Sequence, residues 1–268
     1  MAGSVYALYE RLVAEGLREF ARGGDKLKSF RERVLWELVE ADSATLKERL
    51  GRAVKHFEEL EGALEAAGLP YVAFDAEAVE PLLVGSSGGL GYMVFEVGLS
   101  WDIVYDLPVI PGSAVKGVAR SVVEEAYGEE LAGEVFGRSG EGGAVGPIVF
   151  FDAYPVRARG GLLEPDIVNP HYNPLTNSGL RTELDVNPVP VAHLRVKAGT
   201  VFRFVAAVER RFEGGRVKGA AERMGVGGGL GVLAYLLGAV LGAGVGGRTL
   251  KGYGRFRLAG GVKYYGGV

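Results

Sequence analysis

The chain has 268 residues and a formal net charge of −3, which argues against a free-standing, strongly basic nucleic-acid-binding domain but leaves local basic patches open. It contains no cysteine, which excludes disulfides, thiolate metal sites and cysteine nucleophiles. Glycine accounts for 44 residues, about 16% against a usual value of about 7%, although hydrophobic residues still make up 48%. Many backbone positions must therefore turn sharply or approach another group closely.

The N-terminal 67 residues carry hydrophobic side chains at helical spacing and predict three helices. The three stripes run from Val5 to Val13, from Leu27 to Val39 and from Leu46 to Leu64. Thr45 and Glu48 form a capping-box pattern, so we expect the third helix to begin there. Their charged opposite faces are expected to be solvated surface.

After Pro70 the pattern changes to β-branched and aromatic runs separated by glycine. Strands are expected at 71–74, 82–84, 93–101 and 147–152, and helices at 113–127 and 128–136, with a loop at 137–146. Residues 160–190 contain five prolines and read as a long irregular insertion. Residues 193–196 and 200–208 predict a hairpin, followed by a helix at 230–241 and a strand from Arg255.

This order of elements, strand–helix–strand and then hairpin–helix–strand, is that of a βαββαβ ferredoxin-like domain. We therefore predict an α+β chain with an N-terminal helical extension at 1–69. A ferredoxin-like domain at 70–268 follows, with its insertion at about 160–190.

Residues 224–247 carry no charge, but their dense apolar part covers only about 12 residues, too few to cross a bilayer and typical of a buried helix. Residues 1–20 lack the pattern of a signal peptide. We therefore expect a cytoplasmic chain with no membrane contact. The absence of glutamine and the scarcity of asparagine suit a thermophile, although codon bias explains the excess of glycine, alanine and valine equally well.

One candidate phosphate site lies at the start of the helix expected at 113–127. A turn at Gly112 precedes Ser113, which is placed to cap the helix, and Lys116 and Arg120 share one face. Free N–H groups, the helix dipole and these cations can bind a phosphate, and Gly117 removes bulk beside Lys116. An ordinary capped amphipathic helix explains the same pattern equally well.

A second candidate lies in the segment 242–256, where glycines surround three cations and a tyrosine. Glycines let amides turn towards phosphates, cations supply charge, and a tyrosine can stack on a base or ribose. The segment follows a helix and precedes a strand, and it lacks Gly-Lys followed by Ser or Thr, so a mononucleotide loop is excluded. A polyanion followed along its backbone is favoured over a flexible connection. The residues concerned are Gly244, Gly246, Gly247, Arg248, Lys251, Gly252, Tyr253, Gly254 and Arg255.

Three motifs together, at Ile110–Gly117, Val149–Ala153 and Lys251–Phe256, resemble the RAMP superfamily of CRISPR-associated RNA-binding proteins. Glu96–Leu99 and Asp166–Tyr172 narrow the resemblance to the family of sixth subunits of Cmr (type III-B) effector complexes. The similarity covers roughly residues 80–258.

Two positions depart from that family's pattern. Asp106 stands where a glycine commonly precedes Leu-Pro, and Val109 stands where an aromatic residue is common. These departures bear on the shape of the loop that contains them.

The resemblance implies an RNA-recognition-type core, binding of the guide CRISPR RNA (crRNA) towards its 3′ end, and a role in antiviral defence. The implied partners are the crRNA and other Cmr subunits, both RAMP backbone and end-capping ones, with target RNA met only indirectly. In that family, target cleavage belongs to the backbone subunit, so the resemblance implies a non-catalytic chain without cofactor. By carry-over, the RNA-facing residues are Gly112, Ser113, Lys116, Gly117 and Arg120 and the loop from Gly244 to Arg255.

The alternative is a metal-independent RNA-processing endonuclease. His171, beside Tyr172, can do acid–base chemistry on RNA, and related RAMP nucleases can use histidine. A structural hydrogen bond or a simple RNA contact explains the pair equally well. His56 is expected at the surface, and His193 has no partner nearby in sequence. Asp166 and Asp185 flank the insertion and could bind a metal, but no spacing supports such a site.

Overall fold

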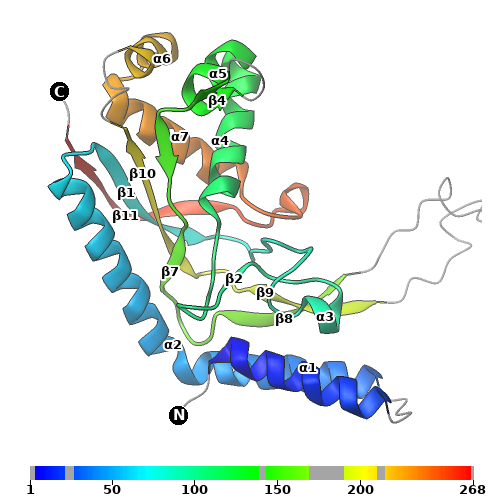
Figure 1. Ribbon diagram of the computed structural model, residues 1–268. Helices are drawn as coiled ribbons and strands as arrows, with labels where there is room; N and C mark the ends of the chain where they lie inside the picture. Colours follow the sequence, from blue (N-terminus) through cyan, green and yellow to red (C-terminus); the bar gives the residue numbers. More distant parts are fainter. Residues whose placement is uncertain (1–3, 22–26, 139–142, 169–189, 210–214, 267–268) are drawn as a thin grey trace, which may run out of the picture.

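A five-stranded antiparallel sheet lies at the centre of the computed structural model, which describes residues 4–21, 27–138, 143–168, 190–209 and 215–266 (Figure 1). Four strands follow the order β11–β1–β10–β6, and β7 also pairs with β10. With β6 and β7 sharing one position, this is the fourth–first–third–second order of a βαββαβ core, so the predicted ferredoxin-like α+β fold is confirmed. The strands are β1 (Tyr71–Ala78), β6 (Ile148–Phe150), β7 (Tyr154–Arg157), β10 (Val201–Val208) and β11 (Phe256–Tyr265).

One face of this sheet is covered by the two crossover helices. They are α4 (Gly112–Tyr127), which follows β1, and α7 (Gly228–Ala243), which precedes β11. Both pack on the strand residues Phe74 and Phe204 in one hydrophobic cluster. The shorter helices α5 (Glu129–Phe136) and α6 (Arg216–Met224) extend this layer (Figure 1). Burial of α7 confirms the prediction of a core helix.

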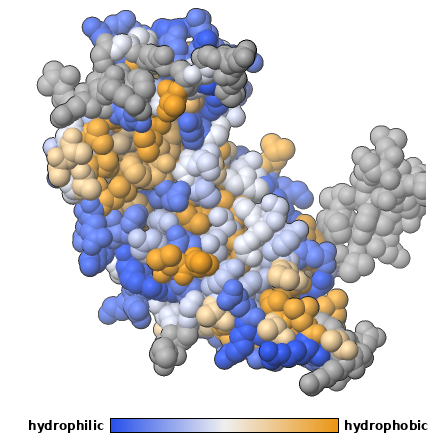
Figure 2. Space-filling view, in the orientation of Figure 1, coloured by the Kyte–Doolittle hydropathy of each residue, from blue (hydrophilic) through white to orange (hydrophobic). Residues whose placement is uncertain are grey.

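The opposite face is covered by α2 (Leu27–Ala66), which Figure 1 shows running obliquely along the sheet. Phe57 of α2 packs on Tyr71 and Val205, which alternate along their strands with the residues of the other face. Helix α1 (Val5–Ala21) lies against the first half of α2. Hydrophilic residues dominate the surface over α2 in Figure 2, as the charge pattern predicts.

The prediction of three N-terminal helices is wrong, because residues 27–66 form one continuous helix. Thr45 lies inside it, and its hydroxyl donates to the carbonyl of Ala41 at 3.1 Å. The hydroxyl of Ser43 likewise donates to Val39 at 3.1 Å. Side chains that often cap a helix here bond to carbonyls of the preceding turn, so the helix does not need to stop.

The strand predicted at 93–101 is also largely wrong. Residues Tyr92–Phe95 form a helical turn, α3, between Gly91 (φ 88°) and Glu96 (φ 62°), whose left-handed backbone interrupts an extended run. Extended pairing is limited to a single bridge from Leu99 to Leu90 and to β2 (Trp101–Asp102), which pairs with β3 (Leu107–Pro108). The strand expected at 82–84 is reduced to a single bridge from Leu82.

The expected hairpin between 193–196 and 200–208 does not form. Strand β9 (Val191–Val196) pairs instead with β8 (Leu163–Val168), which arises within the segment predicted to be irregular. The turn at Gly199 (φ 81°) donates its N–H to Ala78 at 2.7 Å and so directs β10 into the central sheet. Short strands β4 (Gly137–Arg138) and β5 (Ala144–Val145) form in the loop expected at 137–146, and α6 was not predicted.

Within the described residues no single helix is long and apolar enough to cross a membrane. Residues Val217–Met224 and α7 together have the length and composition, but the pair is bent by 62°.

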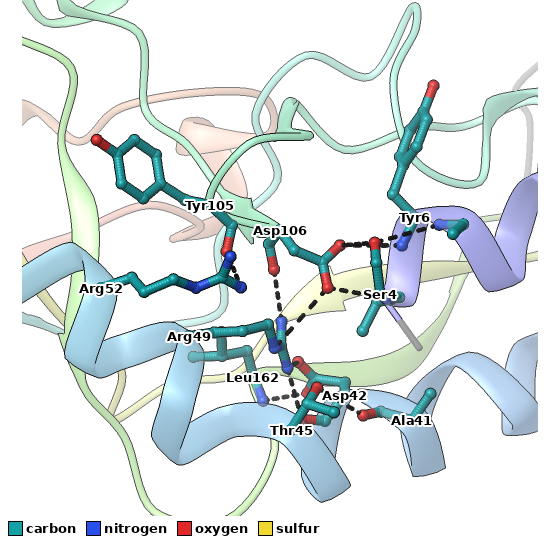
Figure 3. A network of polar contacts seen from close by, with 12 residues as sticks. Ser4, Tyr6, Ala41, Asp42, Thr45, Arg49, Arg52, Tyr105, Asp106 and Leu162 are labelled. Carbon is teal, nitrogen blue, oxygen red and sulfur yellow. Dashed lines mark hydrogen bonds and ion pairs between the residues drawn. The ribbon is translucent and has the colours of Figure 1, made fainter. Parts of the chain in front are cut away.

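A buried polar network joins the N-terminal helices to the domain (Figure 3). Arg49 is 1% exposed and pairs with Asp42 at 2.6 Å while donating to the carbonyl of Asp106 at 2.7 Å. The second carboxylate oxygen of Asp42 accepts the N–H groups of Leu162 and Leu163. One arginine therefore holds α2 to two distant loops.

The backbone conformation and the contacts of Asp106 explain why an aspartate can stand where the family commonly has a glycine. Its φ is 57°, a conformation that glycine adopts freely and that aspartate tolerates better than most residues. Its carboxylate accepts the N–H groups of Val5 at 2.7 Å and Tyr6 at 3.0 Å, and so caps α1 from a hundred residues away. It also accepts the indole N–H of Trp101 at 3.1 Å. Aspartate thus adds contacts that glycine cannot make.

We predict that Arg49→Met lowers the free energy of unfolding by about 3 kcal/mol, because it leaves buried carboxylates without their cation. Denaturant unfolding followed by circular dichroism measures the loss. Arg52→Met is the matched control: Arg52 is exposed, bonds only to carbonyls of the same loop, and should cost under about 1 kcal/mol. Equal losses for the two variants would contradict a special role for the buried network.

Candidate nucleic-acid interface

The start of α4 is built by a close approach between helix and sheet. Gly112 is the first residue of the helix, and a Cβ there would lie 2.2 Å from the carbonyl oxygen of Phe150. Pro111 occupies the cap position, so the prediction of Ser113 as the cap is wrong. The N–H of Gly112 donates to the carboxylate of Asp152 at 2.7 Å. A carboxylate of the chain itself therefore already uses one of the amides expected to receive a phosphate.

The two cations of α4 have different surroundings. Arg120 pairs with Glu124 at 2.6 Å and donates to the carbonyl of Gly137 at 3.1 Å. Lys116 is half-buried and has no ion-pair partner in the described part of the chain. Gly117 is exposed, with open space where a Cβ would stand. Of these two cations, Lys116 is the one that remains available to a ligand.

The Gly-rich loop, residues 244–255, uses many of its amides internally. Gly247 donates to Leu83 at 2.7 Å, Gly254 donates to Pro81 at 2.9 Å, and Val245 donates back to Gly254 at 2.9 Å. Gly254 has a φ of 68°, and a Cβ there would lie 2.0 Å from the carbonyl oxygen of Val245. These glycines allow tight turns and close packing, so their amides are not directed at an outside ligand as the pattern suggested.

Asp166 organises the side chains of this loop. Its carboxylate accepts the hydroxyl of Tyr253 and lies 3.5 Å from Arg248. Arg195 of β9 donates to the same hydroxyl at 2.6 Å and lies 3.3 Å from Asp166. Both guanidinium groups lie over the Tyr253 ring, 5.6 and 5.7 Å from its centre. Arg248 and Tyr253 therefore hold the loop onto the β8–β9 pair.

The two remaining cations of the loop make none of the contacts of this cluster. Lys251 and Arg255 are exposed, and neither has an ion-pair partner among the residues that the structure describes. Leu250, next to Lys251 in the chain, is fully exposed. The loop thus presents two unpaired charges beside side chains that Asp166 holds in place.

His193 is a residue whose surroundings the sequence did not reveal. It lies opposite Asp166 in the β8–β9 register and is completely buried, with Nδ1 3.1 Å from the Asp166 carbonyl and Nε2 3.8 Å from its carboxylate. Burial lowers the pKa of His193, so the ring is neutral near pH 7. Burial raises the pKa of Asp166, but hydrogen bonds from the Tyr253 hydroxyl and the Ile167 N–H, together with the charge of Arg195, lower it by more, so its pKa lies below the ordinary value and the carboxyl is ionised near pH 7.

Of the two other histidines, only His56 lies within the described residues. His56 was expected at the surface, but it is half-buried against Tyr105, whose hydroxyl lies 2.9 Å from Nδ1, and it contacts Tyr154. His171 and Tyr172 lie outside the described residues. Within those residues, no group of three or more metal-ligating side chains comes together.

Comparison with known proteins shows to which superfamily the chain belongs. The family model described as the RAMP superfamily matches residues 75–257, most of the chain, and the chain therefore belongs to this superfamily. That range agrees with the span expected from the motifs.

Within the superfamily the chain is similar to one kind of subunit. It is 34% identical over 174 residues to the CRISPR system CMR subunit Cmr6 of Saccharolobus solfataricus, an alignment covering 65% of this chain. The chain spans 58% of the length of that relative. It also superposes, with a TM-score of 0.65 and 29% identity, on a chain from the cryo-EM structure of the type III-B Cmr-beta bound to cognate target RNA. That alignment covers 80% of this chain and 67% of the other. The expected resemblance to sixth Cmr subunits is thereby confirmed.

We predict that stability falls when the pH drops below about 6.5, the pKa of an unfolded histidine. Because the folded pKa of His193 is depressed, its contribution is complete above that value and is lost as the pH falls towards the folded pKa. Asp166 acts in the same direction at lower pH. The charged groups facing the ring are Asp166, Arg195 and Arg248.

Urea unfolding between pH 8 and about pH 5 measures this dependence. His193→Gln should remove the slope that begins near pH 6.5, whereas His56→Gln should keep it. An unchanged slope in His193→Gln would show that the buried ring is not its source.

Proposed function

We propose that this chain is a non-catalytic, guide-RNA-binding subunit of a type III-B Cmr complex in antiviral defence, contacting the crRNA towards its 3′ end and packing against other RAMP subunits. The observation that supports this most directly is the superposition of 80% of the chain on a chain of the Cmr-beta complex bound to target RNA. The position towards the 3′ end follows from the family resemblance.

The local geometry suggests how the subunit holds RNA. Lys116, Lys251 and Arg255 are cations without carboxylate partners in the described residues, whereas Arg120 and Arg248 are engaged within the protein. Free cations contact phosphates without reading sequence, which suits a guide whose sequence varies. The contacts of Asp166 with Arg248 and Tyr253 hold the loop in place, so that Lys251 and Arg255 can contact the phosphates of the RNA strand.

The overall charge suggests that neighbouring subunits complete the site. A net charge of −3 opposes tight autonomous binding to a polyanion. The N-terminal helices and the segment that includes β8 and β9 are the surfaces we assign to those neighbours. The cytoplasm is the compartment in which such an RNA-guided complex meets foreign transcripts.

We predict that the triple variant Lys116→Gln, Lys251→Gln, Arg255→Gln weakens RNA binding about tenfold or more at low salt. The slope of log K against log[salt] should fall by about 2, since each lost phosphate contact contributes about 0.7 for a single strand. Fluorescence anisotropy with labelled, unstructured single-stranded RNA at about 50–200 mM salt measures both quantities.

The matched control removes the same charge elsewhere, through Arg18→Gln, Lys28→Gln and Lys47→Gln, three exposed cations on α1 and α2. It should bind within about twofold of the parent chain. If the two triple variants bind equally well, the assignment of these cations fails.

The proposal that the chain is non-catalytic has its own test. Labelled RNA incubated with the parent chain should stay intact, with and without divalent cations. Cleavage that disappears in His171→Ala, while the variant still binds the RNA, would instead support the endonuclease, because an imidazole can transfer protons in the reaction. Cleavage that persists in this variant would indicate a contaminant or another active site, which repeated purification distinguishes.

A further inference from the structure

A basic groove lies where β1 and β7 end and where β10 and β11 begin. Its volume is about 590 Å3, and four cations line it: Arg157, Arg159, Lys197 and Arg257. Glu77 is the one carboxylate among its described lining residues. The sequence patterns single out none of these residues, because they come from four separate segments that only the fold brings together.

The charges of this groove are largely uncompensated. Arg257 pairs with Glu77 at 2.9 Å, and Arg157 makes one long contact of 3.5 Å with the carbonyl of Ala259. Arg159 and Lys197 have no carboxylate partner among the described residues. Such a concentration of positive charge stands out in a chain with a net charge of −3. A concave wall focuses the field and attracts anions.

Both walls of the groove are held in place before any ligand binds. On one side, Lys197 donates its N–H to Leu162 at 2.8 Å, and its carbonyl accepts the Thr200 hydroxyl at 2.8 Å. On the other side, Gly161 lies so close to α2 that a Cβ would come within 2.7 Å of the Asp42 carboxylate. Asp42 also fixes the next residue, Leu162, through its N–H. The backbone that carries Arg159 and Lys197 is therefore held before binding, so less backbone ordering is needed when an anion binds.

The lining favours phosphates over bases. Among the described residues that line the groove none is aromatic, so no platform for stacking a base is present.

The groove also adjoins the Gly-rich loop. Phe256 packs on Phe202 and Phe204 in the core, so strand alternation turns Arg255 and Arg257 to the opposite face. Arg255 belongs to the Gly-rich loop, and Arg257 lines the groove.

We propose that this groove binds phosphate groups of an RNA strand and extends the path of the Gly-rich loop across the start of β11. The inference rests on the proposed function, because the same strand would contact both sites. It assigns Arg157, Arg159, Lys197 and Arg257 a sequence-independent contact with the backbone. An RNA long enough to span both sites gains affinity from both, whereas a free nucleotide occupies only one.

The test compares three variants of the full chain in the same anisotropy assay. The groove variant is Arg157→Gln, Arg159→Gln, Lys197→Gln, which leaves the Arg257–Glu77 pair intact. The loop variant is the triple at Lys116, Lys251 and Arg255, and the control is the triple at Arg18, Lys28 and Lys47. Thermal unfolding of each variant checks that the fold is retained. AMP and inorganic phosphate are titrated as competitors.

The groove variant should bind RNA about tenfold more weakly, with the salt slope reduced by about 2, while AMP at equal phosphate concentration competes poorly. If the groove variant binds RNA like the parent while the loop variant is weakened, the groove inference is overturned and the proposed function stands. If both variants bind like the control, the proposed function fails as well. If only AMP binding is lost from the groove variant, the groove is a nucleotide pocket and the inference is wrong.

Discussion

The structure depends on one buried arginine between two carboxylates. Arg49 ties Asp42, in its own helix, to the backbone of Asp106, and those two aspartates bind the N–H groups of distant segments. Charged groups inside a protein are costly unless they are paired. Here Arg49 lies 2.6 Å from the Asp42 carboxylate and 4.0 Å from that of Asp106, and only its Nε lacks a hydrogen-bond partner among these contacts. Because the pairing has a single geometry, it determines where α1, α2 and two loops lie relative to the sheet.

The position of α2 has a consequence for any ligand. The face of a ferredoxin-like sheet opposite its crossover helices is the broad open surface of this fold, and here α2 covers much of it. The basic groove lies at one end of the sheet, where β1 and β7 end and where β10 and β11 begin. Asp42 both anchors α2 and fixes the loop that carries Arg159. The same network therefore holds α2 over the face of the sheet and fixes the backbone at the edge of the basic groove.

A further, half-buried carboxylate, that of Asp166, plays the corresponding part for the Gly-rich loop. Asp166 uses two of the loop's conspicuous side chains, Arg248 and Tyr253, as anchors. The unpaired charges are those of Lys251 and Arg255, which the sequence did not distinguish from Arg248. The groove and the loop meet at Arg255 and Arg257, so the two proposed contact surfaces form one path along the edge of β11.

The sequence alone determined the class of fold and the superfamily, and it singled out two candidate RNA-facing segments, because turns, apolar periodicity and short glycine patterns are local signals. It could not separate Lys251 from Arg248, since an ion pair with Asp166 spans 82 residues. It missed the continuous α2, where tertiary pairing of Asp42 outweighs a local capping signal. It also missed the β8–β9 pair and the groove. Burial and charge compensation depend on which distant segments meet, and only the tertiary structure decides that.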